Sequence, residues 1–148
     1  MGILLLIALT VVCFLVWESR KSRSNKLAFF EQMRWLNQSH RTSFPVDESG
    51  IDLILSDGTL DGSIVFDPTT RKLCLVARKQ QQAEVLDFSY IRQWQLKWTE
   101  KSANGRLSYE NVHFHFSTND IKRPLIRIGD RNKTHADTWN SRLSILLA

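Results

Sequence analysis

The stretch RQWQLKW, residues 92–98, alternates strictly between polar and apolar side chains. Its apolar members, Trp94, Leu96 and Trp98, fall on one face, which is the pattern of a half-buried strand. The stretch ENVHFHFS, residues 110–117, has the same period and turns three apolar side chains inward: Val112, Phe114 and Phe116. Asn104-Gly105 lies between the two stretches and predicts a loop. The chain is therefore expected to contain two successive strands at this point.

Short apolar runs on both sides extend the pattern. Five further strands are expected at residues 51–55, 63–66, 72–77, 84–88 and 124–128. The chain then closes with a helix that is expected to begin at Thr134, because the Thr134 hydroxyl can cap free N–H groups. One apolar stripe along this helix, suited to covering the open end of a curved sheet, is formed by Trp139, Leu143 and Leu146.

Seven short strands followed by one amphipathic helix with a central Trp resemble a pleckstrin-homology-like (PH-like) domain. The resemblance covers roughly residues 46–148, and the stretch VLDFSYIR, residues 85–92, is similar to small bacterial members of that superfamily. It implies an α+β fold in which a seven-stranded curved antiparallel sheet or barrel is capped by the C-terminal helix. It also implies a scaffold that binds lipids, peptides or proteins, and no chemistry.

The N-terminal segment is apolar. Residues 1–17 contain no charged side chain, and four basic residues follow closely: Arg20, Lys21, Arg23 and Lys26. A helix of this length rises about 25 Å, at the short end of what crosses a bilayer core of about 30 Å. A cleaved signal peptide is the alternative, but such peptides start with a basic region and end in small residues, which this segment does not. Residues 1–19 are therefore expected to form a retained transmembrane anchor, with Trp17 at the headgroup level.

The charge asymmetry about this segment predicts its orientation. Because the basic residues lie on the C-terminal side, we expect a short outer N-terminus and a cytoplasmic body, in a single-pass protein of the inner (cell) membrane. The cysteines suit a reducing cytosol. Cys13 lies in the apolar segment and Cys74 in an expected strand, so a disulfide between them would be hard to build.

The net charge of +5 belongs mainly to the segment beside the membrane. Residues 1–43 hold six Lys/Arg against two acids, whereas residues 44–148 hold fourteen against thirteen. Anionic lipid explains this distribution better than nucleic acid does, so no nucleic-acid partner is expected. The candidate headgroup ligands are Arg20, Lys21, Arg23 and Lys26. The competing interpretation is that these four residues only set the topology.

Residues 25–38 predict an amphipathic helix within a basic juxtamembrane segment, residues 20–43. Its apolar side chains could pack on the domain, lie at the lipid interface or pair with a second copy, and packing is favoured because interfacial helices usually have a more strictly divided polar face. Phe44-Pro45 is expected to end the helix, since the residue before a proline avoids the helical region. The PH-like domain would then span residues 44–148.

No catalytic, cofactor or metal site is expected, and the protein is not expected to be an enzyme. His113 and His115 would share one face of a strand, but no third metal ligand is identifiable and His135 lies beyond a loop. Cys74 is expected to be an inert core thiol. The loop at residues 56–63 has two acids and no base, so it lacks the basic cluster of lipid-binding PH-like domains.

Two functions remain open. In the first, the cytoplasmic PH-like domain binds another protein, through an exposed strand edge or the groove beside the C-terminal helix. In the second, the chain is a peripheral binder of anionic lipid that acts through the basic juxtamembrane segment.

Overall fold

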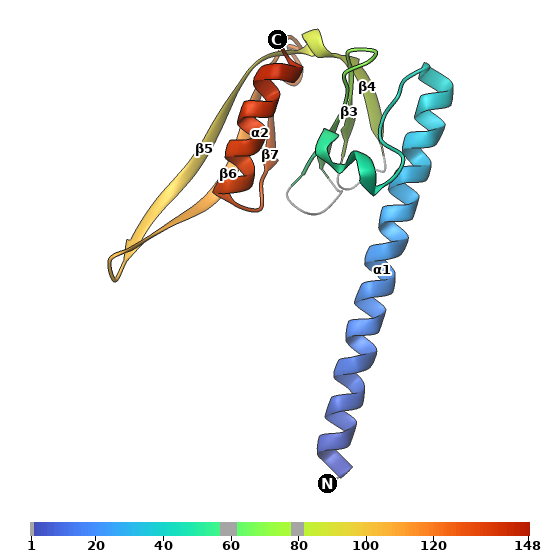
Figure 1. Cartoon of the computed structure of the whole chain (residues 1–148), viewed down its shortest axis with the longest axis vertical. Helices are drawn as coiled ribbons and strands as arrows, with labels where there is room; N and C mark the ends of the chain where they lie inside the picture. Colours follow the sequence, from blue (N-terminus) through green and yellow to red (C-terminus); the bar gives the residue numbers. More distant parts are fainter. Residues whose placement is uncertain (1, 57–61, 78–81) are drawn as a thin grey trace.

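The computed structural model describes residues 2–56, 62–77 and 82–148, and within the first helix it describes side chains from Thr10 onward. Figure 1 shows the whole chain. In order, the described elements are α1 (Gly2–His40), η1 (Glu48–Leu53), β1 (Ile54–Leu55), β2 (Ser63–Asp67), β3 (Lys72–Val76), β4 (Ala83–Asp87), η2 (Phe88–Tyr90), β5 (Ile91–Ala103), β6 (Arg106–Thr118), β7 (Leu125–Gly129) and α2 (Lys133–Leu146). The α+β class and the C-terminal helix are confirmed.

The strands of the described residues form two antiparallel sheets. One has the order β1-β2-β3-β4 and the other β5-β6-β7, and neither closes into a barrel. The expectation of one curved sheet or barrel was therefore wrong in this respect. The helical turn η2 separates β4, which pairs with β3, from β5, which pairs with β6.

The main core lies between the two sheets and under α2. Trp139 of α2 is 1 % exposed, and its ring centre lies 5.8 Å from that of Phe66 in β2. Ala136 and Leu143 complete the buried stripe of α2, while Leu146 is only partly buried. The helix begins one residue before Thr134, because the side chain of Asn132 caps it by accepting a hydrogen bond from the N–H of His135.

A second core lies on the outer face of the four-stranded sheet. Four side chains of α1 are buried there: Phe29, Phe30, Met33 and Leu36. They pack with Val65 and Cys74, which point away from the main core. The preferred prediction for residues 25–38, packing on the domain, is confirmed. The four-stranded sheet is thus covered on both faces, as its fully buried strand β2 requires.

Helix α1 ends at His40, earlier than Phe44-Pro45 predicts. Arg41 takes a left-handed conformation with φ of 53°, and the N–H of Thr42 donates to the carbonyl of Asn37. This pairing across six residues is a Schellman-type helix end. The Asn37 side chain then accepts from the N–H of Phe44 and donates to its carbonyl. Local hydrogen bonds rather than the proline end this helix.

Strand β5 departs from strict alternation. A register shift between Lys97 and Thr99 interrupts its pairing with β6, and Trp98 is 41 % exposed instead of buried. Trp94 and Leu96 lie only partly buried against the main core. The first expected strand is also shorter than predicted, because residues 48–53 form η1 and leave only Ile54–Leu55 in the sheet.

Helix α1 continues without interruption from Gly2 to His40, so the apolar segment and the packed segment form one rod (Figure 1). Among the side chains described, which begin at Thr10 in α1, no helix is long and apolar enough to cross a membrane.

Candidate functional site

The candidate site is an opening between the two sheets, which we call the seam. It is bordered by β4 and β7, each of which pairs with a single neighbour among the described strands. A cavity of about 300 Å³ lies there. Its lining comes from β2, β3, β4 and β7 and from the residues beside them, and it is largely apolar: Gly62, Ser63, Leu75, Val76, Ala77, Gln82, Glu84, Arg123, Ile126 and Ile128. The seam combines unpaired strand edges with an apolar cavity.

An ion pair spans the seam. The Arg123 Nη2 atom donates to the Glu84 carboxylate over 2.6 Å, and both side chains remain 40–50 % exposed. The hydrogen bond to Glu84 raises the pKa of Arg123, so the guanidinium is always charged. Because the pair is exposed, it adds little to stability. Both side chains line the cavity, so their charges lie beside any group that enters it.

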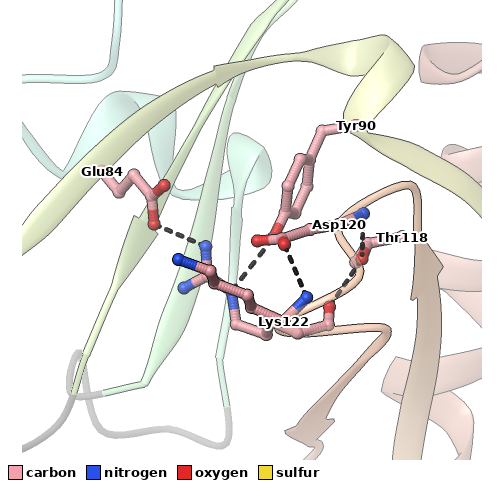
Figure 2. Close-up of polar contacts among 6 residues, drawn as sticks. Glu84, Tyr90, Thr118, Asp120 and Lys122 are labelled. Atoms are coloured by element: carbon pink, nitrogen blue, oxygen red, sulfur yellow. Dashed lines mark hydrogen bonds and ion pairs between the residues drawn. The ribbon is translucent and has the colours of Figure 1, made fainter.

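Tyr90 fixes the guanidinium from the other side. The Arg123 Nε atom donates to the Tyr90 hydroxyl over 3.0 Å, and the guanidinium carbon lies 5.6 Å from the centre of the Tyr90 ring. The Tyr90 hydroxyl in turn donates to Asp120 over 3.3 Å. Figure 2 shows this chain of contacts. A side chain held at two points loses little further entropy when it binds a partner.

The turn before β7 is built to present Arg123. The Thr118 hydroxyl donates to the Arg123 carbonyl over 2.6 Å and accepts from the N–H of Asp120 over 3.1 Å. The Asp120 carboxylate accepts from the N–H of Lys122 over 2.9 Å (Figure 2). These bonds fix the backbone on both sides of Arg123, so the position of its side chain is set by the fold.

The chemistry of the seam suits recognition. An apolar cavity at the low end of ligand-site volumes accommodates a side chain or two of a partner better than a large cofactor. The free edges of β4 and β7 offer backbone N–H and C=O groups to an added strand. Sequence patterns did not predict this site, because Glu84 and Arg123 are 39 residues apart and neither belongs to a motif.

The four basic residues predicted as lipid ligands lie on α1 outside the packed segment, and all are exposed. Arg20 and Arg23 are three residues apart, as are Arg23 and Lys26, so the members of each pair are neighbours on the helix surface. Lys26 pairs with Glu48 of η1 over 3.0 Å, and Lys21 lies 5.3 Å above the Trp17 ring. The structure does not gather all four into one pocket.

The two histidines of the alternating stretch, His113 and His115, lie together on β6. The Nε2 atoms of His113 and His115 are 3.0 Å apart, and among the described residues no group of three or more His, Cys, Asp or Glu could hold a metal ion. Loss of solvent lowers the pKa of His115, and the charge of Lys97 lowers it further. The lowered pKa favours the neutral form of His115.

Two other expectations concern reactive or charged groups. Cys74 is fully buried in the second core, and burial raises the pKa of its thiol to about 12, as an inert core thiol requires. The acidic loop expected at residues 56–63 falls largely on residues 57–61, which lie outside the described part of the chain.

Comparison with known proteins gives no relative: the chain matches no protein family, no curated protein and no solved structure.

Proposed function

We propose that this chain is a single-pass membrane protein of the inner (cell) membrane whose cytoplasmic PH-like domain binds a protein partner at the seam. The anchor is the N-terminal part of α1, and the packed part of the same helix holds the domain close to the bilayer.

One observation carries the anchor. The apolar side chains of α1 between Val11 and Trp17 are each about half exposed, although the segment has no charged residue. Exposed apolar surface of this extent is rare on soluble proteins, and it marks a binding surface for protein or membrane. A bilayer covers a helix on all sides, as this segment requires, whereas a protein partner usually covers one face. The basic residues that follow the segment favour a cytoplasmic body.

The order of elements supports the PH-like assignment. Seven strands followed by a C-terminal helix that packs on the core through a central Trp are what the resemblance implies, although the strands form two sheets in place of one. Such domains are scaffolds for binding, and this accords with the seam.

The seam suggests how a protein partner would be held. An extended segment adding to β7 would place alternate side chains toward the cavity and toward solvent. The inward side chain would be apolar, to match Leu75, Ile126 and Ile128. Charged groups beside it would contact Arg123 or Glu84, which are already fixed in position.

Site-specific photo-crosslinking tests the binding module in intact membranes. A photoreactive residue replacing Ile126, which lines the cavity, is expected to give a discrete adduct with one protein. The matched control replaces Ile145, which is 78 % exposed on α2 and does not line the cavity. The proposal fails if both positions give the same adducts, or if the position in the seam gives none.

The alternative function is anionic-lipid binding by the juxtamembrane residues. It is supported by the exposure of Arg20 and Arg23, whose side chains lie on successive turns of α1. Each basic residue near an anionic surface contributes roughly 1 kcal/mol. This role is compatible with the anchor and would strengthen it. In this alternative the domain is only held near the membrane, so the two functions differ in whether the domain itself binds a protein.

A further inference from the structure

The hairpin of β5 and β6 is longer than the rest of its sheet. β7 pairs only with residues 113–117 of β6, so from Thr99 to Glu110 the described strands pair only with each other. An isolated two-stranded ribbon is marginally stable at best in water. A surface that covers this ribbon would therefore stabilise it.

One face of the ribbon is rich in apolar and aromatic side chains and also carries Glu100, which lies opposite Tyr109. Leu107 is 56 % exposed, Tyr109 is 43 % exposed and Trp98 is 41 % exposed. The Lys133 ammonium of α2 lies 4.1 Å from the centre of the Trp98 ring and 6.0 Å from that of Tyr109, so the two rings share a side of the ribbon. Tyr, Trp and basic side chains together are typical of the layer between lipid and water.

The charge of the tip is positive. On the other face, Lys101 and Glu110 form an ion pair over 2.6 Å, which leaves that pair close to neutral. Between Ser102 and Tyr109 the only charged residue is Arg106. The tip thus carries one cation on one face and exposed apolar groups on the other, and a tip that enters end-on would bring both into an anionic headgroup layer.

The direction of the hairpin completes the argument. Figure 1 shows the hairpin leaving the two sheets toward the same end of the molecule as the N-terminal half of α1, while the C-terminus lies at the opposite end. Helix α1 is continuous and its residues Phe29 to Leu36 are packed on the four-stranded sheet, so the direction of α1 relative to the domain is set by packing.

We propose that the tip of the β5–β6 hairpin, residues 102–109, is a second membrane contact that rests on the bilayer entered by α1. Arg106 contacts lipid phosphate, and Leu107 and Tyr109 enter the headgroup layer. The inference rests on the proposed function, because α1 holds the bilayer beside the hairpin. Two contact points, the helix and the hairpin, would fix the tilt of the domain and the direction in which the seam faces.

The test places an environment-sensitive fluorophore on single cysteines of the full chain in vesicles of phosphatidylethanolamine and phosphatidylglycerol. In a Cys13→Ser background, the probe is attached at Leu107→Cys, and Cys74 is left in place because it is fully buried. The matched control is Ile121→Cys, 95 % exposed on the turn before β7. A third sample carries the probe on the native Cys13. Lipids with nitroxide groups at the headgroup or in the acyl chain serve as quenchers.

The headgroup quencher is expected to act several-fold more strongly on the probe at residue 107 than on the probe at residue 121. Adding Arg106→Glu should reduce quenching at residue 107 and leave the probe on Cys13 unchanged. Equal, weak quenching at residues 107 and 121, with Cys13 quenched from the acyl chains, would overturn the hairpin contact and leave the anchor standing. A probe on Cys13 that no lipid quencher reaches would overturn the anchor itself.

Discussion

At the scale of single residues, one buried carboxylate joins two parts of the chain. Asp67, at the end of β2, is fully buried and accepts hydrogen bonds from the backbone N–H groups of Ser43, Thr69 and Thr70. It also accepts from the Thr70 hydroxyl. Asp67 therefore fixes both its own turn and the linker that follows α1. The linker in turn sets how α1 meets the sheet.

Replacing Asp67 with Ala should lower the free energy of unfolding by about 3 kcal/mol, because several buried donors lose their acceptor. Urea unfolding of the detergent-solubilised chain measures this. The matched control is Asp87→Ala, at the end of β4, where the carboxylate is exposed and its pairing with Lys72 should contribute less than about 1 kcal/mol. Equal losses in the two variants would contradict the bridging role of Asp67.

The burial of Cys74 predicts how its thiol reacts with maleimide. Burial raises its pKa to about 12, so near pH 8 only about one molecule in ten thousand carries the thiolate. Maleimide should leave Cys74 unmodified in the folded chain and modify it in denaturant, as read by peptide mass spectrometry. A cysteine introduced at Ile121 serves as the reactive control. Rapid modification of Cys74 without denaturant would mean that the second core opens.

At the scale of elements, α1 has two different parts. Its C-terminal part packs four apolar side chains on the outer face of the four-stranded sheet, while the part from Thr10 to Ala28 is exposed along its length. One helix thus carries both the proposed anchor and a layer of the domain. A domain fragment that starts at residue 44 would lack this layer and expose Val65 and Cys74.

The packed layer can be tested with two substitutions on one helix. Met33 is fully buried, so Met33→Ala should lower the free energy of unfolding by about 2–5 kcal/mol. Trp35 is 63 % exposed on the same helix, so Trp35→Ala should change it by less than about 0.5 kcal/mol. Urea unfolding of the full chain in detergent compares them. A larger effect at Trp35 would show that another face of α1 is the buried one.

The sequence predicted elements better than their connections. The alternation of apolar and polar side chains predicted β6, and apolar residues at a helical spacing predicted α2, because one face of each element is buried against the core. The exposure of Trp98 was missed, since the register shift after Lys97 depends on pairing with β6 rather than on local sequence. The seam was also missed. Its cavity forms only when β4 and β7 meet in space, and neither strand carries a sign of that contact.

At the scale of the whole molecule, the proposed functions depend on one arrangement. α1 runs past the four-stranded sheet, and the β5–β6 hairpin extends toward the same end of the molecule (Figure 1). The seam lies between the sheets, away from the packed face of α1, because α1 covers the outer face of the four-stranded sheet. A partner could therefore reach the seam while α1 remains in the bilayer.

The most direct test of the account is flotation of the full chain with lipid vesicles through a density gradient in alkaline carbonate, which removes proteins held only by charge. The control variant carries Val12→Lys and Leu15→Lys, each of which should cost about 2.5–3.5 kcal/mol within the bilayer and leave the distant domain folded. If α1 is a membrane anchor, the parent chain floats with the vesicles and the variant stays at the bottom. A folded parent chain that stays at the bottom with the variant would contradict it.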